Sequence, residues 1–153
     1  MIDRGAYLAL SWTMIALAAI TALALRFVVA PYGRHARAGW GPTIPERWGW
    51  MLMESPSLVL VTTLFFAGPN RATPALVALW GMWAAHYAQR TLVYPFRIRG
   101  RKRMPVLVAA MAIAFNVLNG TINGSWLGSL APRDFSAADP WFAAGAVLFV
   151  AGM

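Results

Sequence analysis

The 153-residue chain contains no cysteine, and charged residues of either sign are scarce. The lack of cysteine excludes disulfide bonds, thiolate catalysis and cysteine-ligated metal sites. Charged residues make up 12% of the chain, against roughly a quarter in a soluble globular domain. Hydrophobic residues make up 59%. This composition excludes an ordinary soluble domain and indicates a protein embedded in a membrane.

Several motifs of soluble enzymes are also absent. The sequence has neither a Walker-type phosphate loop nor a GxGxxG motif, which excludes the usual nucleotide-binding folds. No spacing of His, Asp and Glu suggests a metal site. The net charge of +8 does not indicate nucleic acid binding, because no basic module interleaved with aromatic residues is present. We expect no metal and no nucleic acid partner.

Five apolar segments dominate the chain, and a helix that crosses a bilayer needs about 20 residues. They cover residues 6–30, 50–68, 74–96, 104–130 and 141–153, with proline and glycine between them. The first segment has no small-residue cleavage site near its end, so we interpret it as a retained span and not as a signal peptide. The pattern predicts a single-domain, all-α, multi-span membrane protein over residues 1–153, with five spans.

The basic residues gather in alternate loops. Eight of the 13 Lys and Arg lie in two loops, namely Arg34, Arg37 and Arg47 after the first span, and Arg97, Arg99, Arg101, Lys102 and Arg103 after the third. Short loops rich in Lys and Arg stay in the cytoplasm. We therefore expect an N-terminus outside and basic loops inside. The Ala-, Trp- and Arg-rich composition favours a bacterial inner membrane.

The fifth segment has only 13 residues, from Trp141 to Met153. At 1.5 Å per residue it is about 20 Å long, which is short for a hydrocarbon core of about 30 Å. It is either a re-entrant or interfacial helix, or part of a span that continues in a longer protein. We expect the second, because no aromatic anchor or basic flank closes the segment.

The third segment carries polar residues at membrane depth. His86 and Arg90 are one helical turn apart and share a face, while Tyr87, Thr91 and Tyr94 line an adjacent stripe. Ionisable residues at this depth are costly and are most often functional. Tyr87 could donate its phenolic proton or polarise a carbonyl. The alternative is a structural network in the bundle interior, with Arg90 reaching the cytoplasmic interface.

The second segment contains one carboxylate, Glu54, just before Pro56. A carboxylate at that depth must find a partner or take up a proton. Pro56 removes a helical hydrogen bond and leaves a backbone carbonyl free near Glu54. Two alternatives follow: a structural salt bridge to Arg90 or another arginine, or a functional pair with the Tyr87 hydroxyl that grips a ligand carbonyl.

The fourth segment has a polar stripe formed by Asn116, Asn119 and Asn123, with Gly120 and Gly124 beside it. Such residues usually serve helix packing in membranes, but glycine also permits close approach of a ligand. The stripe follows the basic loop, whose cations could bind phosphates.

Taken in order, these segments resemble the steroid 5α-reductase family (3-oxo-5α-steroid 4-dehydrogenases), and the resemblance covers nearly the whole chain. The matching stretches are Tyr32-Gly33-Arg34-His35, Trp50 to Glu54 with Pro56-Ser57, His86-Tyr87-Ala88-Gln89-Arg90-Thr91 with Tyr94, Arg99-Gly100-Arg101, and Asn119-Gly120 with Gly124. The His-Tyr-x-x-Arg-Thr string is the most specific of them.

The resemblance implies a seven-helix enzyme that uses NADPH to reduce the 4,5 double bond of a 3-oxo-Δ4 steroid, with hydride added at C5. Tyr87, supported by Glu54, would bind the 3-oxo group and stabilise the enolate, as an oxyanion hole does. The implied substrate-binding residues are Tyr32, Trp50 and Tyr94. The implied cofactor-binding residues are Arg99, Arg101, Asn119, Gly120 and Asn123, although the family has Gln where this chain has Asn123.

The expected partners are a steroid or steroid-like enone and membrane lipid, and we expect a monomer. Two other classes stay open. A membrane methyltransferase of the isoprenylcysteine or phospholipid type would also place basic loops near its cofactor. A non-enzymatic lipid-binding bundle would explain the composition, but not the joint presence of Glu54 with His86, Tyr87 and Arg90.

Overall fold

The computed structural model describes residues 2–31, 35, 37–99 and 102–153. Five long or medium helices make up most of it: α1 (Arg4–Ala24), α2 (Glu46–Ala67), α3 (Pro74–Ala88), α5 (Val106–Ser125) and α6 (Pro140–Gly152). Shorter elements are the 3-10 turn η2 (Pro69–Ala72), the π-helical turns η3 (Gln89–Val93) and η4 (Trp126–Leu130), and the helix α4 (Tyr94–Arg97). Two three-residue strands, β1 (Thr43–Pro45) and β2 (Arg103–Pro105), pair antiparallel.

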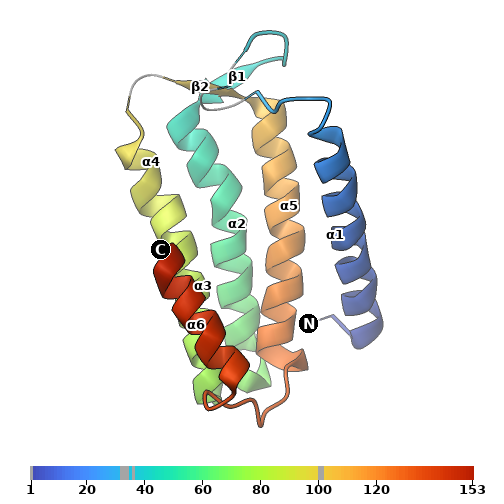
Figure 1. Ribbon diagram of the computed structural model, residues 1–153, viewed down its shortest axis with the longest axis vertical. Coiled ribbons are helices and arrows are strands. Elements are labelled where there is room, and N and C mark those ends of the chain that lie inside the picture. The colour runs from blue at the N-terminus through green and yellow to red at the C-terminus, as the bar shows by residue number, and fades with distance from the viewer. Residues whose placement is uncertain (1, 32–34, 36, 100–101) are drawn as a thin grey trace.

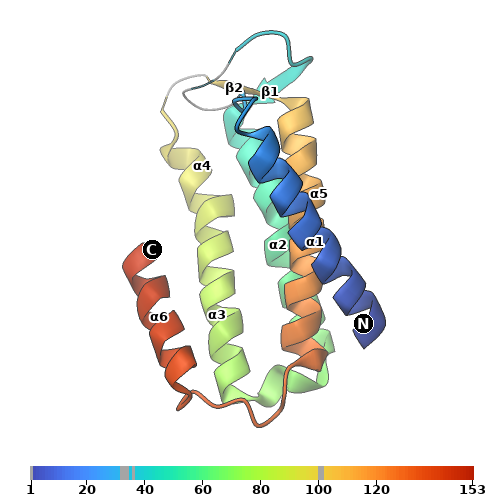
Figure 2. The same ribbon diagram turned by 45° about the vertical axis from the view of Figure 1, so that its right-hand side comes forward.

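The long helices run side by side, as Figures 1 and 2 show. In Figure 1 α3, α2, α5 and α1 follow one another across the molecule, and Figure 2 shows α6 beside α3. The helix α2 is central, because it contacts both α3 and α5, while α1 contacts α5. The β1–β2 ladder closes the end of the bundle where α2 and α5 begin (Figure 1).

The fold class predicted from the apolar segments is confirmed: the chain is an all-α, multi-span membrane protein. Among the described residues, three helices are long and apolar enough to cross a membrane: Arg4–Ala24, Glu46–Ala67 and Val106–Leu130. The third predicted segment is also helical from Pro74 to Arg97, but in three pieces. The fifth is the 13-residue helix α6. The first helix ends at Ala24, earlier than the predicted 30, and the second begins at Glu46, earlier than 50.

Both π-helical turns lie immediately upstream of a proline. The Tyr94 N–H, just before Pro95, donates to the Gln89 carbonyl five residues back. The Ala131 N–H, just before Pro132, donates to the Trp126 carbonyl at 2.8 Å. A proline has no N–H and displaces the carbonyl four residues before it, so an extra residue in the preceding turn restores hydrogen bonding. Such π turns are frequent at functional sites.

Glycines bring α2 and the α5–η4 helix into backbone contact. A Cβ atom on Gly124 would lie 3.0 Å from the Val61 Cα, and one on Gly128 would lie 2.3 Å from the Leu64 carbonyl oxygen. Helices in a membrane associate through such close packing, because lipid is as apolar as the side chains. The glycine spacing therefore fixes how α5 sits on α2.

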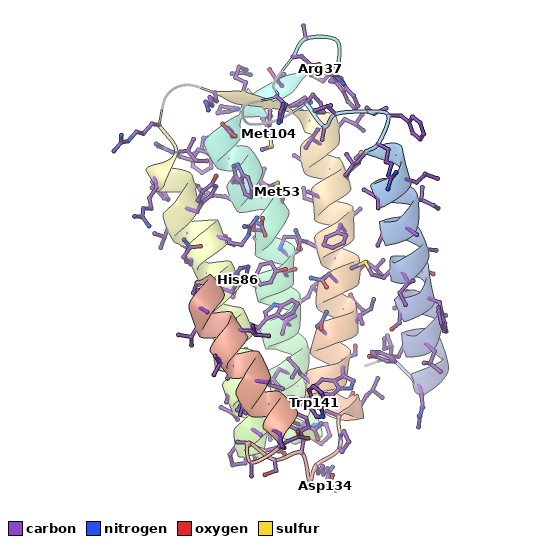
Figure 3. The ribbon with its side chains drawn as sticks, in the orientation of Figure 1. Arg37, Met53, His86, Met104, Asp134 and Trp141 are labelled. Carbon is purple, nitrogen blue, oxygen red and sulfur yellow. The ribbon has the colours of Figure 1, made fainter. Side chains whose placement is uncertain are left out.

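The buried core lies along α2. One cluster near the η2 end contains Val61, Phe65, Leu76, Leu127 and Ala131. A second cluster under the β1–β2 ladder contains Met53, Met104 and Ala109, and Figure 3 shows Met53 and Met104 near that end. By contrast, α1 and α6, which are described in full, contain no buried residue.

Candidate functional site

An ion pair joins α2 to the π turn η3. Arg90 Nη2 lies 2.5 Å from Glu54 Oε1, and the Glu54 side chain is 6% exposed. The Arg90 guanidinium also lies over the Trp50 ring, 5.0 Å from its centroid, a favourable cation–π geometry. Of the two alternatives for Glu54, the structure therefore shows the salt bridge. The carbonyl freed by Pro56, that of Leu52, accepts a hydrogen bond from the Ser55 hydroxyl at 3.2 Å.

Two aromatic rings extend this cluster toward the ladder end of the bundle. Trp50 and Tyr94 meet edge to face, with centroids 4.9 Å apart and planes at 73°. Among the described residues, neither the buried Trp50 Nε1 nor the buried Thr91 hydroxyl has a hydrogen-bond partner. Buried polar groups are normally paired, so this cluster has unused hydrogen-bonding capacity next to Glu54 and Arg90.

Tyr87 is held from the side of α5. Its hydroxyl oxygen accepts a hydrogen bond from Asn119 Nδ2 at 3.2 Å. Asn123 Nδ2 in turn donates to Asn119 Oδ1 and to the Asn119 carbonyl, both at 2.9 Å. The Tyr87 ring stacks on Trp83, with centroids 4.9 Å apart and planes at 27°. The phenol is therefore fixed by ring stacking and by one donated hydrogen bond.

Tyr87 and Glu54 are not hydrogen-bonded to each other among the described residues, although the sequence suggested that pairing. Tyr87 bonds to Asn119, and Glu54 bonds to Arg90. Because Tyr87 and Arg90 are three residues apart on one helix, the two pairs lie about one turn apart along it. They form neighbouring parts of one polar region between α2, α3 and α5.

A cavity of about 590 Å³ adjoins Tyr87 between α3 and α6, within the range of small-molecule pockets. Its wall is largely apolar and includes Trp83, His86 and Phe149. His86 faces this cavity, where its ring meets Phe149 edge to face at 6.5 Å. Figure 3 shows His86 where α6 passes α3. The structure thus separates His86 from Arg90, which faces Glu54.

The polar stripe of α5 divides into two parts. Asn116 serves packing, because its Nδ2 donates to the Met53 carbonyl at 2.6 Å and its Oδ1 accepts from the buried Ser57 hydroxyl at 2.7 Å. Gly120 lies against α2, where a Cβ would approach the Pro56 carbonyl to 3.3 Å. Asn119 donates a hydrogen bond to Tyr87, and Asn123 donates to Asn119. Sequence reasoning missed the Asn119–Tyr87 contact, since spacing within one helix does not reveal a partner on another.

Most of the described basic residues lie at the ladder end of the bundle, where Figure 3 places Arg37, while Asp134 lies at the opposite end. Arg99 is exposed there. A depression of about 490 Å³ at this end includes Arg47, Lys102 and Arg103. The expected substrate residue Tyr32, the expected cofactor residue Arg101 and the matching residues Gly33, Arg34 and Gly100 lie outside the described residues. Within the described part, no group of three metal-binding side chains occurs.

Comparison with known proteins gives a consistent set of matches. The sequence model of the family 3-oxo-5-alpha-steroid 4-dehydrogenase matches residues 102–153. Steroid 5-alpha-reductase DET2 of Arabidopsis thaliana is 38% identical over 143 residues, covering 87% of this chain and 54% of the relative. The 3-oxo-5-alpha-steroid 4-dehydrogenase 1 of Bos taurus is 36% identical over 151 residues, covering 95% of this chain and 58% of the relative. The Homo sapiens protein of the same name is 36% identical over 125 residues, covering 80% of this chain and 48% of the relative. The chain spans about half the length of the curated relatives it matches.

Proposed function

Because the chain belongs to the 3-oxo-5-alpha-steroid 4-dehydrogenase family, we propose that it works as an NADPH-dependent membrane oxidoreductase. The proposed reaction is reduction of the 4,5 double bond of a 3-oxo-Δ4 steroid to the 5α-steroid. The observation that carries the proposal is the fixed phenol of Tyr87, one turn from the Glu54–Arg90 pair and on the wall of an apolar cavity.

Tyr87 is the proposed catalytic donor to the 3-oxo group. Hydride addition at C5 moves the electron pair of the double bond toward the oxygen, which becomes an enolate, and a proton taken up at C4 completes the saturated ketone. A donor aimed at the oxygen stabilises that charge more in the transition state than in the ground state. We propose that Glu54, anchored by Arg90, supports Tyr87 at the carbonyl end of the substrate site.

Trp50 and Tyr94, together with Tyr32 outside the described residues, are the proposed lining of the steroid site. The edge-to-face pair offers flat apolar surface to the rings of a steroid. The buried Trp50 Nε1, which has no partner in the part of the chain that the structure describes, adds a donor that a substrate oxygen could satisfy. An apolar site with a few polar groups is the usual design of a small-molecule pocket.

NADPH would supply the hydride. Arg99 and Arg101 are the residues proposed to bind its phosphates, and the exposure of Arg99 at the basic end of the bundle fits that role, since guanidinium groups bind phosphate oxygens bidentately. Asn119 and Asn123 lie deeper, and the Asn119 carboxamide, which donates one hydrogen bond to Tyr87, has a second N–H that could reach the cofactor. For Gly120 we propose a packing role, because α2 covers it.

We further propose that the protein is a monomer in a bacterial inner membrane, surrounded by lipid, with the N-terminus outside. In this orientation the two basic loops face the cytoplasm, where NADPH is available. Protease protection of tags placed before Asp3 and in the basic loop that precedes Lys102 tests the orientation, and cytoplasmic exposure of the first tag contradicts it.

The test of the function is turnover of testosterone or progesterone with NADPH by the complete gene product in detergent or liposomes. Tyr87→Phe should lower kcat by about 10²–10³, the usual loss for one oxyanion donor, with an unchanged melting temperature. Tyr7→Phe, on the outer helix α1, which has no buried residue, is the matched control. Near-normal turnover by Tyr87→Phe contradicts the role of Tyr87. Activity with S-adenosylmethionine instead of NADPH favours the methyltransferase alternative.

A further inference from the structure

We propose that Asn119 and Asn123 are positioning residues that aim the hydroxyl proton of Tyr87 at the substrate carbonyl. This inference rests on the proposed function and gives two of the expected cofactor residues a different task. It starts from a chain of two hydrogen bonds that runs from Asn123 to Asn119 and from Asn119 to Tyr87.

The chain has a defined direction. Asn123 donates to Asn119 Oδ1, so the oxygen end of the Asn119 carboxamide faces Asn123 and its nitrogen end faces Tyr87. A carboxamide nitrogen has only hydrogens to offer. Asn119 can therefore act only as a donor to Tyr87, and the phenol oxygen must act as the acceptor.

A phenol carries one hydrogen, so accepting from Asn119 leaves Tyr87 with its own O–H to place. Among the described residues, the Tyr87 hydroxyl donates no hydrogen bond, and its single partner is the donor Asn119. An O–H that has no acceptor within the protein is available to an acceptor on a ligand. The arrangement thus favours a ligand that brings a carbonyl oxygen to Tyr87.

The same hydrogen bond also strengthens Tyr87 as a donor. As the phenolic proton moves toward a substrate oxygen, negative charge grows on the Tyr87 oxygen, and the N–H of Asn119 stabilises it. Hydrogen bonds linked in one direction reinforce one another. Asn123 contributes less, because it acts on Tyr87 only through Asn119.

The close approach of α5 to α2 keeps this chain in place. Gly120 is the residue after Asn119, and a Cβ atom on it would lie 3.3 Å from the Pro56 carbonyl oxygen. With no side chain there, α5 sits close enough for Asn119 to reach Tyr87 on α3. The packing of Gly120 therefore supports the position of Tyr87, and Gly120 needs no contact with the cofactor.

The test is a double-mutant cycle in the complete gene product. Asn119→Leu, of similar size but without a donor, should lower kcat roughly tenfold, the worth of about one hydrogen bond, with little change in the KM for NADPH. In the Tyr87→Phe background the same change should alter kcat less than about twofold, because its target is gone. Asn123→Leu should lower kcat less than Asn119→Leu does.

Asn119→Asp provides a second, isosteric variant if Asn119→Leu fails to fold. Its carboxylate would accept the Tyr87 proton and draw it away from the substrate, so the loss in kcat should equal or exceed that of Asn119→Leu. Thr121→Val is the control, because the Thr121 hydroxyl donates only to its own helix at Val117.

The outcomes separate this inference from the proposed function. If the unaltered protein reduces neither steroid with NADPH, the proposed function fails, and if Tyr87→Phe leaves turnover unchanged, the proposed role of Tyr87 fails. If Tyr87→Phe lowers turnover but the losses from Asn119→Leu and Tyr87→Phe multiply, Asn119 does not act through Tyr87, and the inference is wrong. A raised KM for NADPH in both backgrounds assigns Asn119 to the cofactor instead.

Discussion

Helices α1 and α2 are both long enough to span a membrane, yet they differ sharply in burial. Of the three candidate spans among the described residues, α1 is the most apolar and has no buried residue. The helix α2 is the least apolar and has the largest buried share. In water this order would be surprising, because apolar area drives burial there. In lipid it is expected.

The difference shows what holds this bundle together. Lipid gives apolar side chains no reason to leave it, so helices associate through close packing and interhelical polar contacts. The helix α2 has both, in the glycine contacts with α5 and in the Glu54–Arg90 and Ser57–Asn116 pairs. The helix α1 has fewer close glycine contacts and fewer polar contacts to other helices than α2 has. The same features that bury α2 also build the candidate site.

The largest effect on stability is expected from breaking the ion pair. Arg90→Met leaves the buried Glu54 carboxylate without a partner, which should cost about 3 kcal/mol, the low end for buried pairs, since the Arg90 side chain is 35% exposed. Reversible unfolding in mixed micelles measures it. Adding Glu54→Gln should restore most of the stability but not the turnover. Wild-type stability of Arg90→Met would show that the pair does not hold α2 to η3.

Glu54 variants separate structure from function at the same pair. Glu54→Gln keeps an acceptor but loses the charge-assisted hydrogen bond, which is roughly twice as strong as a neutral one, so substrate binding and rate should fall, and Glu54→Leu should be worse. Melting temperature and activity are measured on the same samples. If both variants lose stability before they lose activity per folded molecule, Glu54 is only a structural partner of Arg90.

The glycine contact between α2 and η4 should give the next effect. In Gly128→Ala the new Cβ would meet the Leu64 carbonyl oxygen at 2.3 Å, and forcing the helices apart should cost about 2 kcal/mol. Gly145→Ala on α6 is the matched control, because nothing lies within 4 Å of its Cβ position. Equal melting temperatures for the two variants would refute close packing as the source of α2 burial.

A smaller effect is expected from the packing asparagine. Asn116→Leu removes the hydrogen bonds to the Met53 carbonyl and the Ser57 hydroxyl, which should cost about 1 kcal/mol in a membrane. Thr13→Val on α1 serves as control, since the Thr13 hydroxyl is exposed and bonds only to Ala9 of its own helix. A loss no larger than that of the control would mean that the Asn116 contacts add nothing to stability.

The smallest effect should come from α1. Leu23 is 62% exposed, and Leu23→Ala should change the free energy of unfolding by less than about 0.5 kcal/mol, as at other surface positions. The same substitution at the fully buried Leu76 should be clearly destabilising, by about 2 kcal/mol or more. A comparable loss at both positions would remove the contrast between the outer helix and the core.

Much of the architecture was predictable from the sequence. Apolar runs of span length and the prolines between them predicted the positions of the helices, and the composition predicted the membrane. Each of these features acts within a single segment: apolar side chains avoid water, and proline lacks an N–H. The helices that pack against that segment therefore do not have to be known. The helix ends shifted by a few residues, at Ala24 and Glu46, because turns and the β1–β2 ladder outside the apolar runs also contribute.

The pairings within the site needed the tertiary structure. From the sequence, Glu54 had two possible partners, Arg90 and Tyr87. The packing of α2 against η3 pairs Glu54 with Arg90, while Tyr87 accepts a hydrogen bond from Asn119. Likewise, the asparagines of one stripe have two different roles: Asn116 hydrogen-bonds to α2, and Asn119 hydrogen-bonds to Tyr87 on α3. Which side chains meet depends on the rotation and depth of each helix relative to its neighbours. Contacts between helix backbones at the glycines set those quantities, and no single segment encodes them.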